Sequence, residues 1–188
     1  DEALAHVGSV GRPAPGVRYR LAAGDGRVVP PGEVGEIQLQ AANLMRGYHR
    51  LPAGAGFVDG WCATGDLART DAAGIVTVVG RSKDMLISGG ENIYPAEIEN
   101  IAITWPGVAE AAVVGLPDAR WGEVPVLVLV PQPGAAVDLD GLQALFNQRL
   151  ARFKHPRRTV LQAEVPRTAL GKVQKAALRA VLQADNAP

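Results

Sequence analysis

The sequence predicts an α+β protein built from a β-rich subdomain and a smaller α+β domain that follows it. Over residues 1–79, Gly and Pro recur at short intervals between short runs of alternating apolar and polar residues, a pattern typical of antiparallel strands. After Gly80, segments with helical periodicity appear between apolar runs of strand length. The length of 188 residues is sufficient for one domain or two small ones, with a hydrophobic core.

The β-rich part is expected to contain strands at residues 17–21, 33–39 and 74–79. A Gly-Asp-Gly turn separates the first two strands, and a turn at residues 71–74 precedes the third. Short strands at this spacing are typical of small barrels and sandwiches. We therefore expect a β-barrel-like subdomain over residues 1–79.

The second part is expected to mix strands with three helices. The first helix begins at Pro95, a residue suited to the first helical turn, and ends before Pro106. The expected strands cover residues 85–87, 109–116, 124–130 and 159–161. The other two helices are expected around Leu142, Leu145, Phe146 and Leu150, and over residues 173–182 with Ala177, Leu178, Val181 and Leu182 facing inward.

The composition is that of an ordinary globular protein, with 47% hydrophobic and 20% charged residues. No apolar run approaches the roughly 20 residues of a membrane-spanning helix, and no basic-then-apolar leader is present. The sequence does not begin with Met, which suggests a piece of a longer chain. The single Cys62 excludes an intrachain disulfide and suits a reducing compartment, so we expect a cytoplasmic location.

The charge is unevenly distributed although the net charge is zero. Residues 1–148 contain 10 Lys and Arg against 17 Asp and Glu, whereas residues 149–188 contain 9 against 2. The basic segment suits either a solvated helix face or a surface that meets a polyanionic small molecule. Nucleic acid is not an expected partner, because aromatic residues do not interleave with the basic ones and no nucleic-acid-binding motif appears.

Two stretches place polar residues beside Gly. In Thr64-Gly65-Asp66, the Asp66 carboxylate is a natural acceptor for two ribose hydroxyls, although a turn or a helix cap explains the same residues. In residues 80–92, Arg81 is suited to clamp a phosphate or a ribose oxygen. Lys83 lies where the composition changes, as a hinge would. The Ser88-Gly89-Gly90 run allows a ligand to pass close to the backbone, and a surface hairpin is the alternative.

A third stretch, from Pro166 to Lys172, places a lysine after a Gly and just before the last predicted helix. It is not a Walker phosphate loop, because Pro166 replaces the first Gly and Val173 replaces the hydroxyl residue. Lys172 is suited to stabilise anionic oxygens, with a solvated surface lysine as the alternative. The three histidines are far apart and Cys62 has no cysteine partner, so no metal site is expected.

Together and in this order, the three stretches resemble the later motifs of the adenylate-forming superfamily, which includes acyl-CoA synthetases, peptide-synthetase adenylation domains and luciferase. Thr64-Gly65-Asp66-Leu67 resembles the ribose-binding motif, residues 80–99 the hinge-and-loop motif, and residues 166–172 the motif with the catalytic lysine. Tyr-Pro-Ala-Glu-Ile-Glu and Gly-Lys-Val-Gln-Lys are more similar to CoA ligases of fatty, aryl or malonyl-type acids. The resemblance covers essentially the whole chain.

The resemblance implies a two-step reaction. A carboxylic acid reacts with ATP, with the help of Mg²⁺, to give an acyl-adenylate and pyrophosphate, and CoA then takes the acyl group as a thioester. In this reading Asp66 and Arg81 bind the nucleotide, Lys172 is catalytic in adenylation, and Ser88, Gly89 and Gly90 line the passage for CoA.

The resemblance also implies a domain organisation. Residues 1–79 end a large AMP-binding domain, residues 80–84 with Lys83 form a hinge, and residues 85–188 form the small mobile lid domain. The front of the family pattern, including its phosphate loop, is absent from the 188 residues. The partners would therefore include the preceding part of the same chain, which would also hold the Mg²⁺ ligands.

We expect an ATP-dependent acyl-CoA synthetase, most similar to fatty-acid ligases, of which these 188 residues alone are inactive. Two alternatives belong to other classes. One is a peptide-synthetase adenylation domain that loads a carrier protein. The other is a non-catalytic protein that uses the lid domain for binding.

Overall fold

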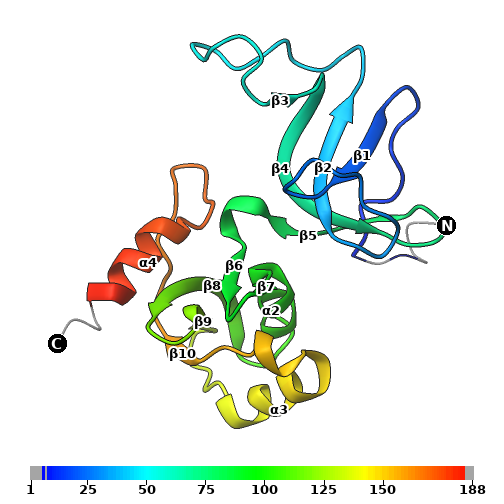
Figure 1. Ribbon diagram of the computed structural model, residues 1–188. Helices are drawn as coiled ribbons and strands as arrows, with labels where there is room; N and C mark the ends of the chain where they lie inside the picture. Colours follow the sequence, from blue (N-terminus) through cyan, green and yellow to red (C-terminus); the bar gives the residue numbers. More distant parts are fainter. Residues whose placement is uncertain (1–5, 7, 185–188) are drawn as a thin grey trace. The chain divides into compact units, whose positions relative to one another are not determined.

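The computed structural model describes residue 6 and residues 8–184 (Figure 1). The chain divides into two compact units at the Lys83–Asp84 peptide bond. Each unit has its own five-stranded sheet and its own buried apolar cluster, and the α-helices of the described residues lie in the second unit. This mixed architecture confirms the predicted α+β class. Among the described residues, no helix has both the length and the apolar character needed to cross a membrane.

The first unit is an antiparallel sheet that curves along its longest strand. Its strands are β1 (Arg18–Ala22), β2 (Gly35–Gln40), β3 (Phe57–Val58), β4 (Trp61–Thr70) and β5 (Val76–Arg81). The order is β1-β2-β4-β3, and β5 pairs with β4. The pairing of β4 with β2 and with β5 contains a register shift in each case, and β4 bends visibly (Figure 1). The three predicted strands of this unit are thus present within two residues at each end.

The second unit is a mixed sheet with helices on both faces. Its elements follow the short 3₁₀ helix η1 (Ser82–Asp84) in this order: β6 (Leu86–Ser88), β7 (Glu91–Ile93), α2 (Pro95–Ala102), β8 (Val108–Asp118), β9 (Gly122–Pro131), α3 (Leu139–Arg149), η2 (Arg152–Lys154), β10 (Arg158–Leu161) and α4 (Lys175–Ala184). The strand order is β10-β9-β6-β7, and β8 pairs with β9. Because β10 is parallel to β9, the connection between them needs a crossover, which α3 provides.

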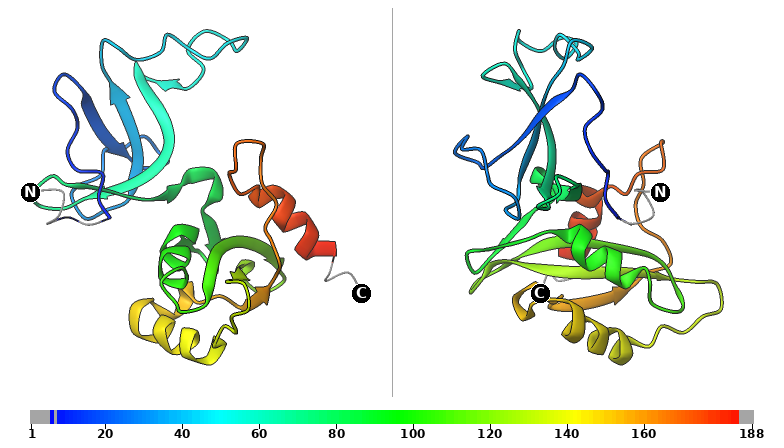
Figure 2. Two further views of the ribbon diagram at one scale, coloured as in Figure 1. Left: turned by 180° about the vertical axis from the view of Figure 1, so that it is seen from behind. Right: turned by 90° about the vertical axis from the view of Figure 1, so that its right-hand side faces the viewer.

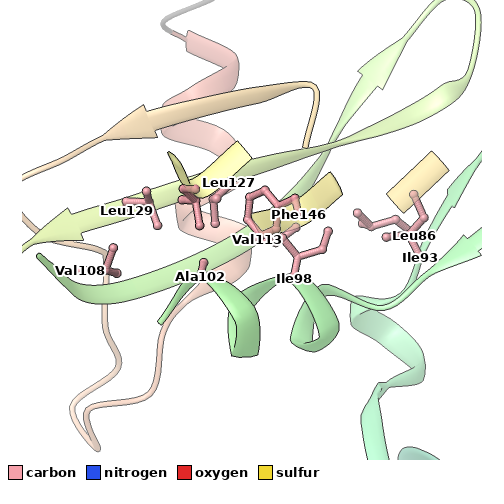
Figure 3. Packing of buried hydrophobic residues seen from close by; sticks show 10 residues of the cluster. Leu86, Ile93, Ile98, Ala102, Val108, Val113, Leu127, Leu129 and Phe146 are labelled. Carbon is pink, nitrogen blue, oxygen red and sulfur yellow. The ribbon is translucent and has the colours of Figure 1, made fainter. Parts of the chain in front are cut away.

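Strands β8 and β9 are apolar on both faces because both faces are covered. Val113 and Leu127 face the cluster that contains Ile98 of α2 and Phe146 of α3 (Figure 3). Their chain neighbours point the other way, toward the cluster that contains Leu178 of α4. Successive side chains of a strand point to opposite faces of the sheet. Because helices cover both faces here, successive positions have to be apolar wherever the strands are covered, which gives a continuous apolar run. Figure 2 shows the sheet with its helices from two further directions.

The helix ends follow local chemistry. Pro95 occupies the start of α2, and Asp138 caps α3 by accepting a hydrogen bond from the Gly141 amide at 3.0 Å. Helix α4 begins at Lys175, two residues later than predicted, because Val173 pairs instead with Arg167 in an isolated antiparallel bridge. The predicted inward position of Val181 is wrong, because that residue is 44% exposed while Leu178 and Leu182 are buried.

Candidate functional site

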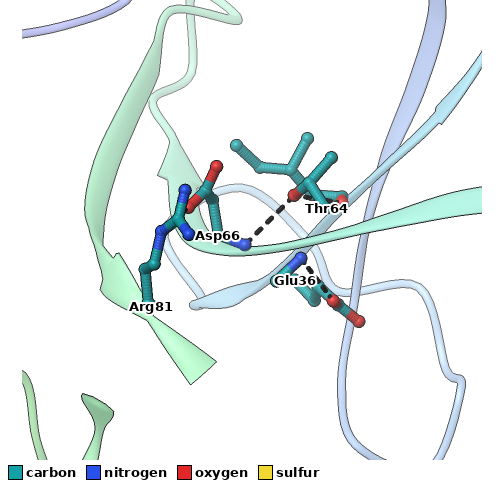
Figure 4. A network of polar contacts seen from close by, with 6 residues as sticks. Glu36, Thr64, Asp66 and Arg81 are labelled. Carbon is teal, nitrogen blue, oxygen red and sulfur yellow. Dashed lines mark hydrogen bonds and ion pairs between the residues drawn. The ribbon is translucent and has the colours of Figure 1, made fainter. Parts of the chain in front are cut away.

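Asp66 and Arg81 form an ion pair on the first unit. They lie directly opposite each other on β4 and β5, and the Asp66 Oδ1 to Arg81 Nε distance is 2.8 Å (Figure 4). The Arg81 side chain is 53% exposed and that of Asp66 is 32% exposed. The remaining carboxylate oxygen and guanidinium donors are therefore accessible to a polar ligand. The pair combines an acceptor for hydroxyl groups with a donor for phosphate or ribose oxygens.

Thr64 and Gly65 explain how the strand presents Asp66. Gly65 has a φ of +76°, which favours glycine, and its amide donates to the Glu36 carboxylate at 2.8 Å (Figure 4). The Thr64 hydroxyl donates to the Ile37 carbonyl at 2.8 Å and accepts from the Asp66 amide at 3.1 Å. The stretch is therefore an irregularity inside a strand. The alternative of a helix cap is wrong here, since strand β4 continues on both sides of Asp66.

Lys83 lies in η1, at the boundary between the two units, with an exposed side chain. Its position agrees with the change of composition from which we inferred a hinge. A 3₁₀ turn has weaker hydrogen-bond geometry than an α-helix, which suits a segment that changes its backbone angles. The hinge itself stays a prediction.

Ser88, Gly89 and Gly90 lie at the tip of the β6–β7 hairpin, close to Trp121. Gly89 and Gly90 have φ angles of +60° and +87°. A Cβ atom on Gly89 would lie 2.6 Å from the Trp121 ring, and the Gly89 amide donates to the Trp121 carbonyl at 2.9 Å. Glycine is therefore required at position 89 by close packing as well as by backbone angle.

A pocket of about 450 Å³ opens beside this hairpin. Ser88 and Gly89 line it together with Trp121 and with Arg152 and Arg157 from the segment around η2. The guanidinium of Arg157 lies 5.3 Å from the centre of the Trp121 ring, within cation–π range. The pocket thus combines an aromatic surface with positive charge, a combination suited to a ligand that contains both a ring and phosphate groups.

The Asp118 carboxylate fixes the loop that positions Trp121. It accepts hydrogen bonds from the amides of Arg120 at 2.8 Å and Trp121 at 2.9 Å. These amide donors, that of Trp121 first, hold the pKa of Asp118 below its ordinary value.

Tyr94, just before α2, has its pKa raised by burial and by the nearby Glu97. Sequence reasoning did not name Trp121, Arg152 or Arg157 as site residues, although the basic run around Arg157 was a signal.

Lys172 lies on a separate hairpin of the second unit, between β10 and α4, and its side chain is exposed. The structure therefore brings together two sets of the predicted residues: Asp66 with Arg81 in the first unit, and Ser88 with Gly89 and Gly90 in the second. In residue 6 and residues 8–184, His, Cys, Asp and Glu side chains form no group of three or more that would hold a metal ion.

Two family models match the chain. Residues 1–49 match the AMP-binding enzyme family and residues 97–172 match the AMP-binding enzyme C-terminal domain. An indoleacetate–CoA ligase of Aromatoleum aromaticum is 48% identical over 176 residues, which cover 93% of this chain and 34% of the relative. A feruloyl-CoA synthase of an Amycolatopsis species is 46% identical over 92% of this chain and 36% of the relative. The chain thus spans about a third of the length of these relatives.

A solved structure of similar fold is the o-succinylbenzoate CoA synthetase from Bacillus subtilis in complex with its acyl-adenylate intermediate. The TM-score is 0.87 at 37% sequence identity, and the match covers 94% of this chain and 36% of the other. At this identity the likeness extends beyond the fold. The sequence resemblance and the structural one therefore point to the same family.

Proposed function

Because the chain belongs to the AMP-binding enzyme family of adenylate-forming CoA ligases, we propose that it is the C-terminal part of an acid–thiol ligase that forms AMP. The proposed reaction joins a carboxylic acid to CoA through an acyl-adenylate, at the expense of ATP. The observation that supports it most is the Gly89–Trp121 contact, because this closely packed glycine hairpin lies beside a pocket lined by Arg152 and Arg157. All partners in this reaction are small molecules, consistent with the absence of a nucleic-acid-binding motif.

The residues of the first unit are proposed to bind the nucleotide. The Asp66 carboxylate accepts hydrogen bonds from the ribose hydroxyls, and Arg81 binds a neighbouring oxygen. The Asp66–Arg81 ion pair, 2.8 Å long, orients both side chains before ATP arrives. Lys172, delivered by the second unit, stabilises the negative charge that develops when the carboxylate attacks the α-phosphate.

The residues of the second unit are also proposed to bind CoA. Ser88, Gly89 and Gly90 border the passage for the pantetheine arm, where the absence of side chains on the two glycines leaves room. Arg152 and Arg157 attract the phosphates at the nucleotide end, and Trp121 offers a flat surface to it. Rotation about Lys83 would present Lys172 to the active site in the adenylation half-reaction. It would then present the CoA passage in its place for thioester formation.

The reaction uses Mg²⁺ to neutralise the phosphates of ATP. The described residues hold no group of three acidic or His and Cys side chains suited to it, so we propose that its ligands lie in the preceding part of the longer protein. We also propose that the 188 residues alone are inactive, because they contain no Ser/Thr/Gly-rich phosphate loop. The purified chain should give no CoA thioester with ATP and a panel of acids, and detectable thioester would overturn this point.

The substrate class is proposed to be a fatty acid. The motif forms at residues 94–99 and 171–175 resemble ligases of fatty, aryl and malonyl-type acids alike, and two similar proteins of Mycobacterium tuberculosis are named as fatty-acid–CoA ligases. Two relatives act, by their names, on indoleacetate and ferulate, so aryl acids are the competing outcome. A cytoplasmic location, supported by the single Cys62, belongs to the same proposal.

The proposal is tested with the longer protein that contains these residues. Pyrophosphate exchange is measured with fatty, aryl and malonyl-type acids, and thioester formation is then measured with CoA and with a carrier protein. We expect exchange with at least one acid and thioester formation with CoA. Exchange followed by transfer only to the carrier protein would indicate a peptide-synthetase domain, and no exchange with any acid would indicate a non-catalytic protein.

A further inference from the structure

The hairpin that holds Lys172 is more ordered than its exposure suggests. The Thr168 amide donates to the Lys172 carbonyl at 2.8 Å, and the Gly171 amide donates to the Thr168 carbonyl at 2.9 Å. The Thr168 hydroxyl accepts from the Lys172 amide at 3.2 Å, so side chain and backbone close the same turn. Leu170 at the tip is 86% exposed. The backbone of Lys172 is thus fixed by the hairpin, and the hairpin projects from the second unit (Figure 2).

Arg167 attaches this hairpin to the sheet. One terminal nitrogen of its guanidinium donates to the Gly171 carbonyl at 2.5 Å, which is the carbonyl of the peptide bond that leads into Lys172. The other terminal nitrogen pairs with the Glu110 carboxylate on β8. The guanidinium is planar and rigid, so its two bonds fix the direction of the Gly171–Lys172 peptide relative to a core strand. Lysine, with a single flexible ammonium, cannot form this fork.

A second attachment lies on the other side of Lys172. The Lys175 ammonium donates to the Glu99 carboxylate of α2 at 2.7 Å, and the same carboxylate oxygen accepts from the Val113 amide of β8 at 2.7 Å. Arg167 and Lys175 therefore lie on either side of Lys172 in the sequence. Each forms an ion pair with an acidic residue of β8 or α2. The pair at Arg167 is the one that contacts the peptide of Lys172 directly.

Stability does not explain the Arg167–Glu110 pair. Their side chains are 41% and 37% exposed, and ion pairs at this exposure add little to the free energy of unfolding. What the pair adds is geometry, on which transfer at phosphorus depends strongly. Resting on the proposed function, we infer that Arg167 and Glu110 are positioning residues, which aim Lys172 for the adenylation half-reaction.

The test uses the longer protein with Arg167→Lys and Glu110→Gln, each assayed in both half-reactions. Displacing Lys172 by about 1 Å is expected to lower kcat for adenylation about tenfold to a hundredfold. The KM for ATP and the rate of thioester formation from preformed acyl-adenylate should change by less than about threefold, because Lys172 acts only in the first step. Glu33→Gln is the matched control, since Glu33 forms an exposed ion pair with Arg27 on the first unit.

Arg167→Lys in a Lys172→Ala background tests whether Arg167 acts by positioning Lys172 or has a role of its own. If Arg167 acts through Lys172, adding Arg167→Lys to Lys172→Ala causes no further loss of adenylation. A full additional loss would overturn the inference, as would an equal fall in both half-reactions or an Arg167→Lys variant as active as Glu33→Gln. Absence of adenylation in the unsubstituted protein would instead overturn the proposed function.

Discussion

The backbone at Gly89 approaches the Trp121 ring so closely that a single methyl group would disturb the proposed CoA passage. A Cβ atom there would lie 2.6 Å from the ring, whereas a Cβ atom on Gly90 would meet nothing within 4 Å. We therefore expect Gly89→Ala to lower thioester formation from preformed acyl-adenylate by about tenfold or more. Adenylation should be retained. Gly90→Ala is the control, since it introduces similar backbone strain at a φ of +87° without the contact; equal losses in the two variants would argue against the contact as the cause.

Asp118 sets a pH dependence at the residue scale. Amide hydrogen bonds from Trp121 and Arg120 lower its pKa in the folded protein. A carboxyl whose pKa is lower in the folded than in the unfolded protein stabilises the fold at pH values above its unfolded-state pKa. This stabilisation is lost as the pH falls through its folded-state pKa. The ordinary pKa of Asp is about 4, and that of Asp118 is lower. We therefore expect the Trp121 indole resonance, followed by NMR, to shift only at pH values below about 4. In Asp118→Asn, which keeps an acceptor oxygen, this shift should be absent.

Irregular backbone was predicted best where glycine marked it. Gly65, Gly89 and Gly171 have positive φ angles, and each lies in a stretch selected from the sequence. The ion-pair partner of Asp66 was not predicted, because Arg81 becomes its cross-strand neighbour only through the β4–β5 register. Trp121 was missed as a pocket residue for the same reason: its contact with Gly89 joins segments more than 30 residues apart.

At the scale of elements, long apolar runs were predictable and polar strands were not. Strands β8 and β9 were predicted because both faces are buried over most of their length, which leaves apolar runs after Glu110 and after Glu123. Strand β4 was not, since its Thr-Gly-Asp stretch has no apolar alternation and resembles a turn. Helix α4 was predicted two residues too early, because Val173 has the apolar spacing of the helix but closes the Lys172 hairpin.

Glu99 links three elements, and its substitution gives a stability prediction. Its carboxylate on α2 accepts from the Val113 amide of β8 and from Lys175 of α4. Glu99→Ala leaves the buried Val113 amide without its acceptor, so we expect the free energy of unfolding to fall by about 1–3 kcal/mol. Glu99→Gln keeps an acceptor oxygen and loses only the ion pair, so a fall of less than about 1 kcal/mol is expected.

Denaturant titration of both variants gives these values. The prediction fails if Glu99→Gln is destabilised as much as Glu99→Ala, because the ion pair rather than the amide would then be the main contribution. Lys175→Met is a useful third variant, since it removes the charge from α4 and leaves the Glu99–Val113 hydrogen bond in place.

At the scale of the whole molecule, several basic residues at the end of the sequence form ion pairs within the second unit. Four ion pairs of the second unit each join a basic residue of the last 40 positions to an acidic residue earlier in the chain. These pairs attach the Lys172 hairpin, α4 and the η2 segment to the sheet and to α2. The sequence suggested either a solvated face or a surface for a polyanion, and did not suggest intramolecular clamping. Pairing of distant residues is set by the fold, so composition alone does not reveal it.

The division of the chain at the Lys83–Asp84 bond leads to the last prediction, which concerns the proposed hinge. Proline fixes φ near −65° and restricts the residue before it, so Lys83→Pro would limit rotation between the units. In the longer protein we expect Lys83→Pro to retain one half-reaction and to lower the other about a hundredfold, because each requires its own arrangement of the units. Lys83→Ala, which removes the exposed side chain and leaves the backbone free, should change both rates by less than about threefold. If Lys83→Ala caused the same selective loss as Lys83→Pro, the side chain rather than backbone rotation would be responsible, and the hinge would have to be placed elsewhere.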